Sequence, residues 1–265
     1  MSWKFFLYLL VGYLALCLLV FVFQRKLIYL PGQFRFSKAA AASEGLRHWP
    51  IIENFQGFVG NDEPENASGT VIVFHGNAGA ALHRSFYVEA LSRLSLRVIL
   101  AEYPGYGGRP GEPSEEALVQ DALQIIERAH RDYGEPIFLW GESMGSGVIA
   151  SAVAKTKVPI KGLVLMTPWD SLSDLAQAHY WFLPTRWLVL DKYDSIENLR
   201  NFSGNVAVVL AREDRVVPVK HGQRLYDSIT TNKKRWMFEN VGHNSIPIAP
   251  QLQWWEEVIE FVARF

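Results

Sequence analysis

The residue that most clearly suggests chemistry is a serine between two glycines, in the sequence Gly141-Glu142-Ser143-Met144-Gly145. A short apolar run, residues 137–140, precedes it, and small and apolar residues follow to about residue 155. A buried strand, a tight turn and a helix form the context in which G-x-S-x-G exposes a serine hydroxyl as a nucleophile. The glycines let strand and helix approach closely, and the helix N-terminus favours negative charge. The pattern predicts Ser143 as a nucleophile, provided that the chain supplies its partners.

A serine hydroxyl is a poor nucleophile at neutral pH, so it needs a histidine to take its proton and a carboxylate to orient that histidine. Asp214 follows the apolar run 206–210, and His243 lies in the sequence Val-Gly-His-Asn. Glu213 is a direct rival for the acid, but the position of Asp214 before Val-Val-Pro favours Asp214. The other histidines lie on segments more typical of packed or solvated positions, or on an upstream turn: His48, His75, His83, His130, His179 and His221. The predicted catalytic residues are therefore Ser143, Asp214 and His243.

A tetrahedral intermediate also needs two preorganised donors for its oxyanion. The backbone N–H of Met144, directly after the serine, is the first candidate. The turn His75-Gly76-Asn77 follows another apolar run, and the backbone N–H of Asn77 is the second candidate.

Apolar runs alternate with helical segments along most of the chain. Strands are expected at 70–74, 97–101, 137–140, 162–166, 206–210 and 235–238, and helices at 82–94, 114–133 and 252–264. This alternation predicts an α/β fold with a mostly parallel central sheet flanked by helices. Ligands bind at the carboxyl ends of the strands in such sheets, and the predicted site residues all follow strand ends.

The segment before this alternation has a different pattern. Residues 48–59 contain alternating apolar positions, and residues 60–69 form a polar turn, so we expect two early strands joined by such a turn in an antiparallel hairpin. Residues 27–31 are expected as a short strand or a juxtamembrane segment, and residues 37–45 as a linker or short helix.

Residues 5–23 carry no charge and, as a helix, would rise about 28 Å, close to the hydrocarbon thickness of a bilayer. A buried core helix is the alternative, but the segment is apolar all round. A cleaved signal peptide fits poorly because Gln24-Arg25-Lys26 follows directly instead of a small-residue cleavage site. A lipoprotein box ending at Cys17 is disfavoured by the large Leu16. We predict a single-pass membrane anchor at 1–26, followed by one catalytic domain at 27–265.

The charges that flank the apolar segment favour one orientation. Lys4 precedes it, whereas Arg25, Lys26, Arg35 and Lys38 follow it. The positive-inside rule therefore favours a catalytic domain on the cytoplasmic side.

Composition excludes several other classes of function. The chain has 265 residues, 49% of them hydrophobic, and a formal net charge of −1, so nucleic acid is not an expected partner. Cys17 is the only cysteine, which rules out a disulfide framework and a cysteine-based metal site. No histidine–carboxylate pair has ligand spacing, so no metal is expected. The sequence PGYGGRPG at 104–111 lacks the Gly-Lys-Ser/Thr ending of a phosphate-binding loop.

Five motifs together resemble the α/β-hydrolase superfamily: HGNAG at 75–79, YPGYGGRPGEPSE at 103–115, GESMG at 141–145, REDRVVP at 212–218 and GHN at 242–244. The chain is most similar to the single-span, membrane-anchored branch related to prolyl-oligopeptidase-like hydrolases and protein depalmitoylases. The resemblance implies the α/β-hydrolase fold and serine hydrolysis of an ester, thioester or amide without a cofactor. Glu142 departs from many relatives, and we assign it no role.

Residues 179–190, HYWFLPTRWLVL, lie where this fold commonly inserts a lid, which we expect around 170–200. The segment has too many apolar side chains for a solvated loop. Packing of the lid against the core is one interpretation. The other is an acyl-chain groove near the bilayer, in which Trp181 and Trp187 bind substrate.

These observations predict a membrane-anchored serine hydrolase that cleaves acyl esters or thioesters of small-molecule or lipid-like substrates through an acyl-enzyme. A serine peptidase with the same triad is an alternative within enzymes. A non-catalytic interaction domain on the same fold is the alternative outside them, and the presence of all three triad residues argues against it.

Overall fold

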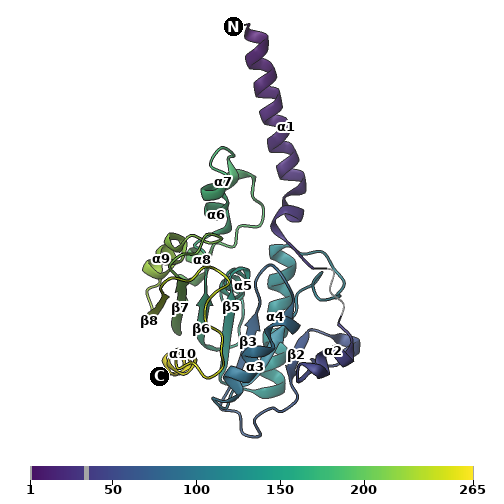
Figure 1. Cartoon of the computed structure of the whole chain (residues 1–265), viewed down its shortest axis with the longest axis vertical. Helices are drawn as coiled ribbons and strands as arrows, with labels where there is room; N and C mark the ends of the chain where they lie inside the picture. The colour runs from purple at the N-terminus through teal and green to yellow at the C-terminus, as the bar shows by residue number, and fades with distance from the viewer. Residues whose placement is uncertain (1, 33–35, 265) are drawn as a thin grey trace.

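The structure is a computed structural model that describes residues 2–32 and 36–264. Its centre is an eight-stranded sheet with the order β1-β2-β4-β3-β5-β6-β7-β8 (Figure 1). The strands are β1 (Leu46–Trp49), β2 (Gly57–Gly60), β3 (Thr70–Phe74), β4 (Arg97–Ala101), β5 (Ile137–Glu142), β6 (Ile160–Met166), β7 (Asn205–Ala211) and β8 (Lys233–Phe238). Strand β2 runs antiparallel to β1 and β4, and β3 to β8 pair in parallel. The prediction of a mostly parallel sheet is confirmed.

Helices cover both faces of the sheet. One face packs against α3 (Ser85–Ser92) and α10 (Trp254–Ala263), and the other against α4 (Glu115–Tyr133), α5 (Met144–Val153) and α9 (Val219–Ser228). The inner strands are apolar on both sides because both of their faces are covered. Helix α4 begins where the sequence predicts, since the Ser114 hydroxyl accepts a hydrogen bond from the Ala117 N–H at 3.1 Å.

The early strands differ from the expected arrangement. The hairpin forms from β1 and β2, with the short 3-10 helix η1 (Ile52–Asn54) between them, and the polar segment 61–69 instead connects β2 to β3. The apolar alternation at 48–59 suggested one strand, but β1 ends at Trp49, because the next residue, Pro50, has no N–H to donate to a neighbouring strand. Residues 27 and 28 belong to the first helix rather than to a strand, while α2 (Lys38–Ser43) confirms the expected short helix.

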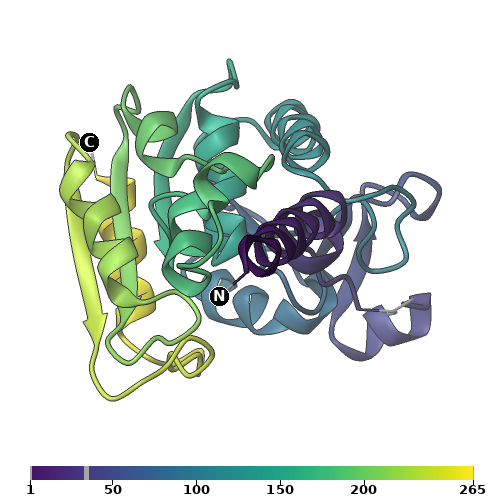
Figure 2. The same ribbon diagram turned by 90° about the horizontal axis from the view of Figure 1, so that it is seen from above.

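Helix α1 (Trp3–Ile28) projects from the body of the fold in Figure 1 and is seen nearly end-on in Figure 2. It is long and apolar enough to cross a membrane, by length and composition. Only Cys17 and Gln24 are buried among its residues. Arg35, one of the charges that favoured an orientation, lies outside the described residues.

The C-terminal end of α1 and the residue after it are held by hydrogen bonds and an ion pair to the segment between β6 and β7. The Tyr29 hydroxyl lies 3.1 Å from Asp191 Oδ2 and 3.1 Å from the Tyr193 hydroxyl, and all three residues are buried. Arg25 Nε pairs with the same Asp191 carboxylate at 3.2 Å. Burial, followed by the neighbouring Tyr193, raises the pKa of Tyr29 well above its ordinary value, so this hydroxyl stays protonated and can donate. The segment itself contains α6 (Leu172–His179), the short α7 (Thr185–Leu188) and α8 (Ser195–Leu199).

Candidate active site

Ser143 occupies a strained turn between β5 and α5. Its backbone has φ 52° and ψ −111°, a left-handed conformation that is uncommon for a residue with a side chain. The two flanking glycines are required by space. A Cβ on Gly145 would lie 1.9 Å from the Phe74 carbonyl oxygen, and one on Gly141 would lie 2.5 Å from the backbone of Ser146. The turn can therefore form only where strand and helix backbones meet without side chains between them.

The imidazole of His243 lies between Ser143 and Asp214. Its Nε2 is 3.0 Å from the Ser143 hydroxyl oxygen, and its Nδ1 is 2.6 Å from Asp214 Oδ2. The other carboxylate oxygen of Asp214 accepts the N–H groups of Val216 and Val217 at 2.9 and 2.7 Å. A carboxylate fixed in this way accepts the Nδ1 proton, which leaves the Nε2 lone pair directed at the serine hydroxyl.

The structure also separates the two acidic residues that compete in the sequence. Asp214 is buried and faces His243, whereas Glu213 is exposed. The Glu213 N–H donates to the Val241 carbonyl at 3.0 Å, and this contact ties the loop after β7 to the loop that carries the histidine. The predicted trio comes together because β5, β7 and β8 all end at the same edge of the parallel sheet.

The turn after β3 lies against the serine. A Cβ on Gly76 would be 3.6 Å from the Cβ of Ser143. The Asn77 side chain is occupied, because its Nδ2 donates to the Ile28 carbonyl, and its Oδ1 accepts from the Leu30 N–H at 3.0 Å and from the Tyr106 hydroxyl at 2.8 Å. The backbone N–H is therefore the group that Asn77 can offer a substrate. The N–H of Met144 stands at the first position of α5, where a helix has no internal acceptor.

A buried pair, which the sequence analysis did not identify, holds that turn. His75 Nε2 lies 2.9 Å from Glu102 Oε1, and His75 Nδ1 lies 2.7 Å from the Gly76 carbonyl oxygen. Glu102 Oε2 accepts the Ala81 N–H at 3.0 Å. Both ring nitrogens of His75 therefore face oxygen atoms within the fold, and these contacts hold the imidazole in place. The sequence indicates this pair only through the position of Glu102, a glutamate directly after a buried strand.

A second ion pair lines a cavity beside the histidine. The cavity measures about 340 Å³ and is lined by His83, Arg84, Phe86, Glu142, Met166, His243, Asn244, Ile246 and Ile248. Arg84 donates from Nε and Nη2 to the two oxygens of Glu142 at 2.8 and 2.7 Å. Burial alone would lower the pKa of Arg84, but the hydrogen bonds and charge of Glu142 raise it, so the guanidinium stays charged. Glu142, without a role in the sequence analysis, is a wall of this cavity.

The two lid tryptophans do not line this cavity. Residues Trp181 and Trp187 are 80% and 87% exposed, so neither packs against the core. Both tryptophans lie at the tip of the segment between β6 and β7, away from the core. Leu183 of the same segment is buried instead. A substrate-binding role for the two tryptophans stays a prediction. Among residues 2–32 and 36–264, no group of three or more histidine, cysteine or acidic side chains could hold a metal ion.

Comparison with known proteins gives matches of several kinds. A family model described as "Serine aminopeptidase, S33" matches residues 65–191. An uncharacterized protein of Mycobacterium tuberculosis is 33% identical over 250 residues, which cover 91% of this chain and 86% of that protein. Lysophosphatidylserine lipase ABHD12 of Danio rerio is 30% identical over 188 residues, which cover 64% of this chain and 49% of the lipase. The chain thus spans about half the length of the lysophosphatidylserine lipases that it matches.

Solved structures agree on the architecture. An esterase of Pyrococcus furiosus has a TM-score of 0.67 at 17% identity and covers 90% of this chain and 98% of its own. Est1E from Butyrivibrio proteoclasticus, described with bound ferulic acid, has a TM-score of 0.64 at 17% identity over 77% of this chain and 94% of its own. At such identity the likeness shows the fold alone. Fold and sequence relatives together show that the chain belongs to the α/β-hydrolase superfamily, and the protein is a hydrolase. The predicted superfamily and fold are confirmed.

Proposed function

We propose that this hydrolase is a membrane-anchored serine enzyme that cleaves acyl esters or thioesters through an acyl-enzyme. The observation that carries the proposal is the imidazole of His243, which reaches Ser143 with one nitrogen and Asp214 with the other. Helix α1 supports the anchor, since it is apolar on nearly all sides and exposed. The lipid-like substrate class is supported by the lysophosphatidylserine lipases among the relatives.

The proposed mechanism follows from these positions. His243 Nε2 takes the hydroxyl proton as Ser143 Oγ attacks the acyl carbon. The backbone N–H groups of Met144 and Asn77 stabilise the oxyanion, and the positive end of α5 adds to this. The histidine then gives its proton to the departing alcohol or thiol. A water molecule, activated by the same nitrogen, releases the acyl group from the serine.

The composition of the cavity beside His243 favours an ester over a peptide with a free amino end. Its walls carry Phe86, Met166, Ile246 and Ile248, which suit an acyl chain. An aminopeptidase needs an available carboxylate for the substrate ammonium group. The carboxylate that lines this cavity, Glu142, is already held by both donors of Arg84.

A panel of esters, thioesters and aminoacyl amides, varied in acyl length, tests this proposal on the full chain in detergent or vesicles. We expect hydrolysis of esters and thioesters, and a loss of kcat on the order of 10⁶-fold in Ser143→Ala. Cleavage of aminoacyl amides without ester hydrolysis would identify a peptidase instead. Folded protein that hydrolyses nothing in the panel would favour the non-catalytic interaction domain.

A further inference from the structure

The tip of the segment between β6 and β7 presents apolar side chains to the outside. We call lid patch the exposed side chains of Tyr180, Trp181, Phe182, Trp187 and Leu190. The rings of Trp181 and Phe182 contact each other at a centroid distance of 5.9 Å. Soluble surfaces rarely gather large apolar side chains in this way, and such patches usually meet a partner or a membrane.

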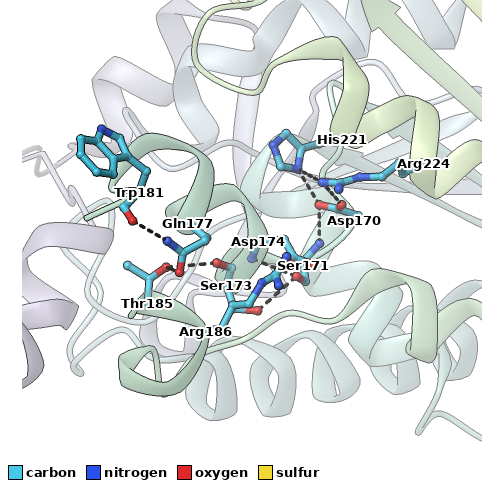
Figure 3. Close-up of polar contacts among 10 residues, drawn as sticks. All are labelled: Asp170, Ser171, Ser173, Asp174, Gln177, Trp181, Thr185, Arg186, His221 and Arg224. Carbon is cyan, nitrogen blue, oxygen red and sulfur yellow. Dashed lines mark hydrogen bonds and ion pairs between the residues drawn. The ribbon is translucent and has the colours of Figure 1, made fainter. Parts of the chain in front are cut away.

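The lid patch is held in place by hydrogen bonds within its own segment. Gln177 Nε2 donates to the Trp181 carbonyl at 3.2 Å, and the Thr185 hydroxyl donates to Gln177 Oε1 at 3.1 Å. Arg186 Nε pairs with Asp174 at 2.7 Å. Figure 3 shows the Trp181 ring pointing away from this network. The exposure of the tryptophan is therefore a feature of an ordered segment.

The same segment runs along helix α1. The Tyr13 hydroxyl donates to the Phe182 carbonyl at 2.9 Å. Further down the helix, Gln24 donates to the Leu188 carbonyl at 3.2 Å and accepts the Leu190 N–H at 2.8 Å. Tyr13 and Gln24 are separated by about 16 Å of helix at ~1.5 Å per residue. The segment that carries the lid patch therefore runs alongside the middle and C-terminal part of the helix, from Tyr13 to Gln24.

This contact fixes the depth of the patch relative to any bilayer that α1 crosses. Tyr13 lies close to the middle of the uncharged stretch 5–23. If that stretch fills the hydrocarbon, the lid tip beside Tyr13 lies within the membrane, in the leaflet nearer the catalytic domain. The polar groups at the contact are paired, as a low-dielectric surrounding requires. Arg25, Lys26 and Lys192 lie toward the other end, at the level suited to lipid headgroups.

We propose that the lid patch is a second membrane-embedded element, which inserts among the acyl chains of the leaflet beside α1. The inference rests on the proposed anchor and goes beyond it. The catalytic domain is then seated on the bilayer by two elements in contact, rather than held by a tether that leaves it free in water.

Single-cysteine variants of the full chain test this inference, in a Cys17→Ser background and phosphatidylcholine vesicles. An environment-sensitive fluorophore is placed at Trp187→Cys in the lid patch, at Leu9→Cys in the exposed helix, and at Lys155→Cys. Lys155 is exposed and follows the C-terminal end of α5, whereas Ser143 precedes its N-terminal end, so the helix separates the two residues. Nitroxide-labelled lipids quench fluorophores in the hydrocarbon, and aqueous iodide quenches those in water. Circular dichroism of each variant checks the fold.

We expect lipid nitroxides to quench the labels at positions 187 and 9 several-fold more than the label at 155, and iodide to show the reverse order. If the label at 9 is quenched by lipid while the label at 187 behaves like that at 155, the anchor stands and the embedded lid patch is refuted. If the label at 9 is also accessible only to iodide, the anchor and this inference fail together.

Discussion

Asp214 meets two demands at once, because each of its oxygens has its own partners. One oxygen receives the N–H groups of Val216 and Val217, which fixes the carboxylate in its loop. The other oxygen is left to the Nδ1 of His243. The orientation of the imidazole, and with it the direction of the Nε2 lone pair, therefore depends on one side chain.

The exchange Asp214→Asn tests that dependence. Its oxygen keeps the two N–H partners, so its NH₂ group must face His243, which forces the ring proton onto Nε2. The ring can then no longer accept the serine proton, and we expect kcat for a short-chain ester to fall by about 10⁴-fold. Glu213→Gln is the matched control and should leave kcat near that of the wild type. The opposite pattern would show that Glu213 is the acid.

The buried pair of His75 and Glu102 should act on the rate through the position of the turn that carries Asn77. Oxygen Oε1 of Glu102 also accepts the Tyr103 N–H at 3.2 Å, and Oε2 accepts the Ala81 N–H. In Glu102→Gln one of these oxygens becomes an NH₂ group, so one of the two backbone N–H groups loses its acceptor. We expect kcat to fall by about 10- to 100-fold with little change in KM, because the turn supplies a proposed oxyanion donor. Loss of stability with unchanged kcat would assign the pair a purely structural role.

The individual residues of the site differ in how visible they are in the sequence. Ser143, Asp214 and His243 each lie in a recognisable local motif and each follow an expected strand, so motif and topology together predicted that they meet. The pair of Arg84 and Glu142 joins residues 58 positions apart, and that of His75 and Glu102 joins residues 27 apart. Their contacts depend on how neighbouring loops fold over the sheet edge, which composition and periodicity do not encode.

Among the elements, α9 is tied to the loop after β6 by a charge cluster in which Asp170 and His221 are buried and Arg224 is half exposed. Asp170 Oδ1 lies 2.7 Å from His221 Nδ1, and Arg224 Nη2 pairs with Oδ2 at 2.5 Å (Figure 3). Burial acts to raise the pKa of Asp170, but the hydrogen bonds from His221 and the Ser171 N–H, with the charge of Arg224, lower it below the ordinary value of 3.8. The ionised carboxylate is thus favoured by the folded state.

Because the folded-state pKa is depressed, this contribution is present above the ordinary value and is lost as the pH falls through the folded value. We expect Asp170→Asn to lower the free energy of unfolding by about 1–3 kcal/mol at neutral pH. The difference from wild type should shrink at pH values below 3.8. Denaturant unfolding measures both. Glu197→Gln, whose pair with Arg200 is more than half exposed on both sides, is the control and should cost less than about 1 kcal/mol. A pH-independent difference would contradict the account.

The positions of helices and strands were predictable where each apolar run forms a single strand. The six strands β3 to β8 and the helices α4 and α10 fall where periodicity places them. The predicted antiparallel hairpin forms, but its connection was placed wrongly at 60–69, because the apolar alternation continues across Pro50 and does not show where a strand turns back. Sequence periodicity thus fails at the sheet edge, where strands are short and pairing is antiparallel.

On the scale of the whole molecule, the division into an anchor at 1–26 and a catalytic domain at 27–265 stays a prediction. The helix itself was evident from its composition. Its contact with the lid was not, because Gln24 and Leu190 are 166 positions apart and meet only in the folded chain. Contacts cross the proposed boundary between residues 26 and 27, because Gln24 and Arg25 bind the segment between β6 and β7.

Removal of residues 1–23 tests whether the helix is what holds the protein in the membrane. The cut leaves the contacts of Gln24, Arg25 and Tyr29 with that segment in place. We expect the full chain to resist extraction of membranes by alkaline carbonate, and the truncated chain to be extracted. The truncated chain should still hydrolyse a short, soluble ester. Extraction of the full chain under the same conditions would contradict a spanning helix.

The most direct test of the account is the site of covalent attack. The full chain is treated with a fluorophosphonate, and the adduct is measured by intact mass and located by peptide mapping. We predict one adduct per chain, on Ser143, and loss of that adduct in His243→Ala. Folded protein that gains no adduct, or gains it on another residue, would contradict the assignment of Ser143 as the nucleophile.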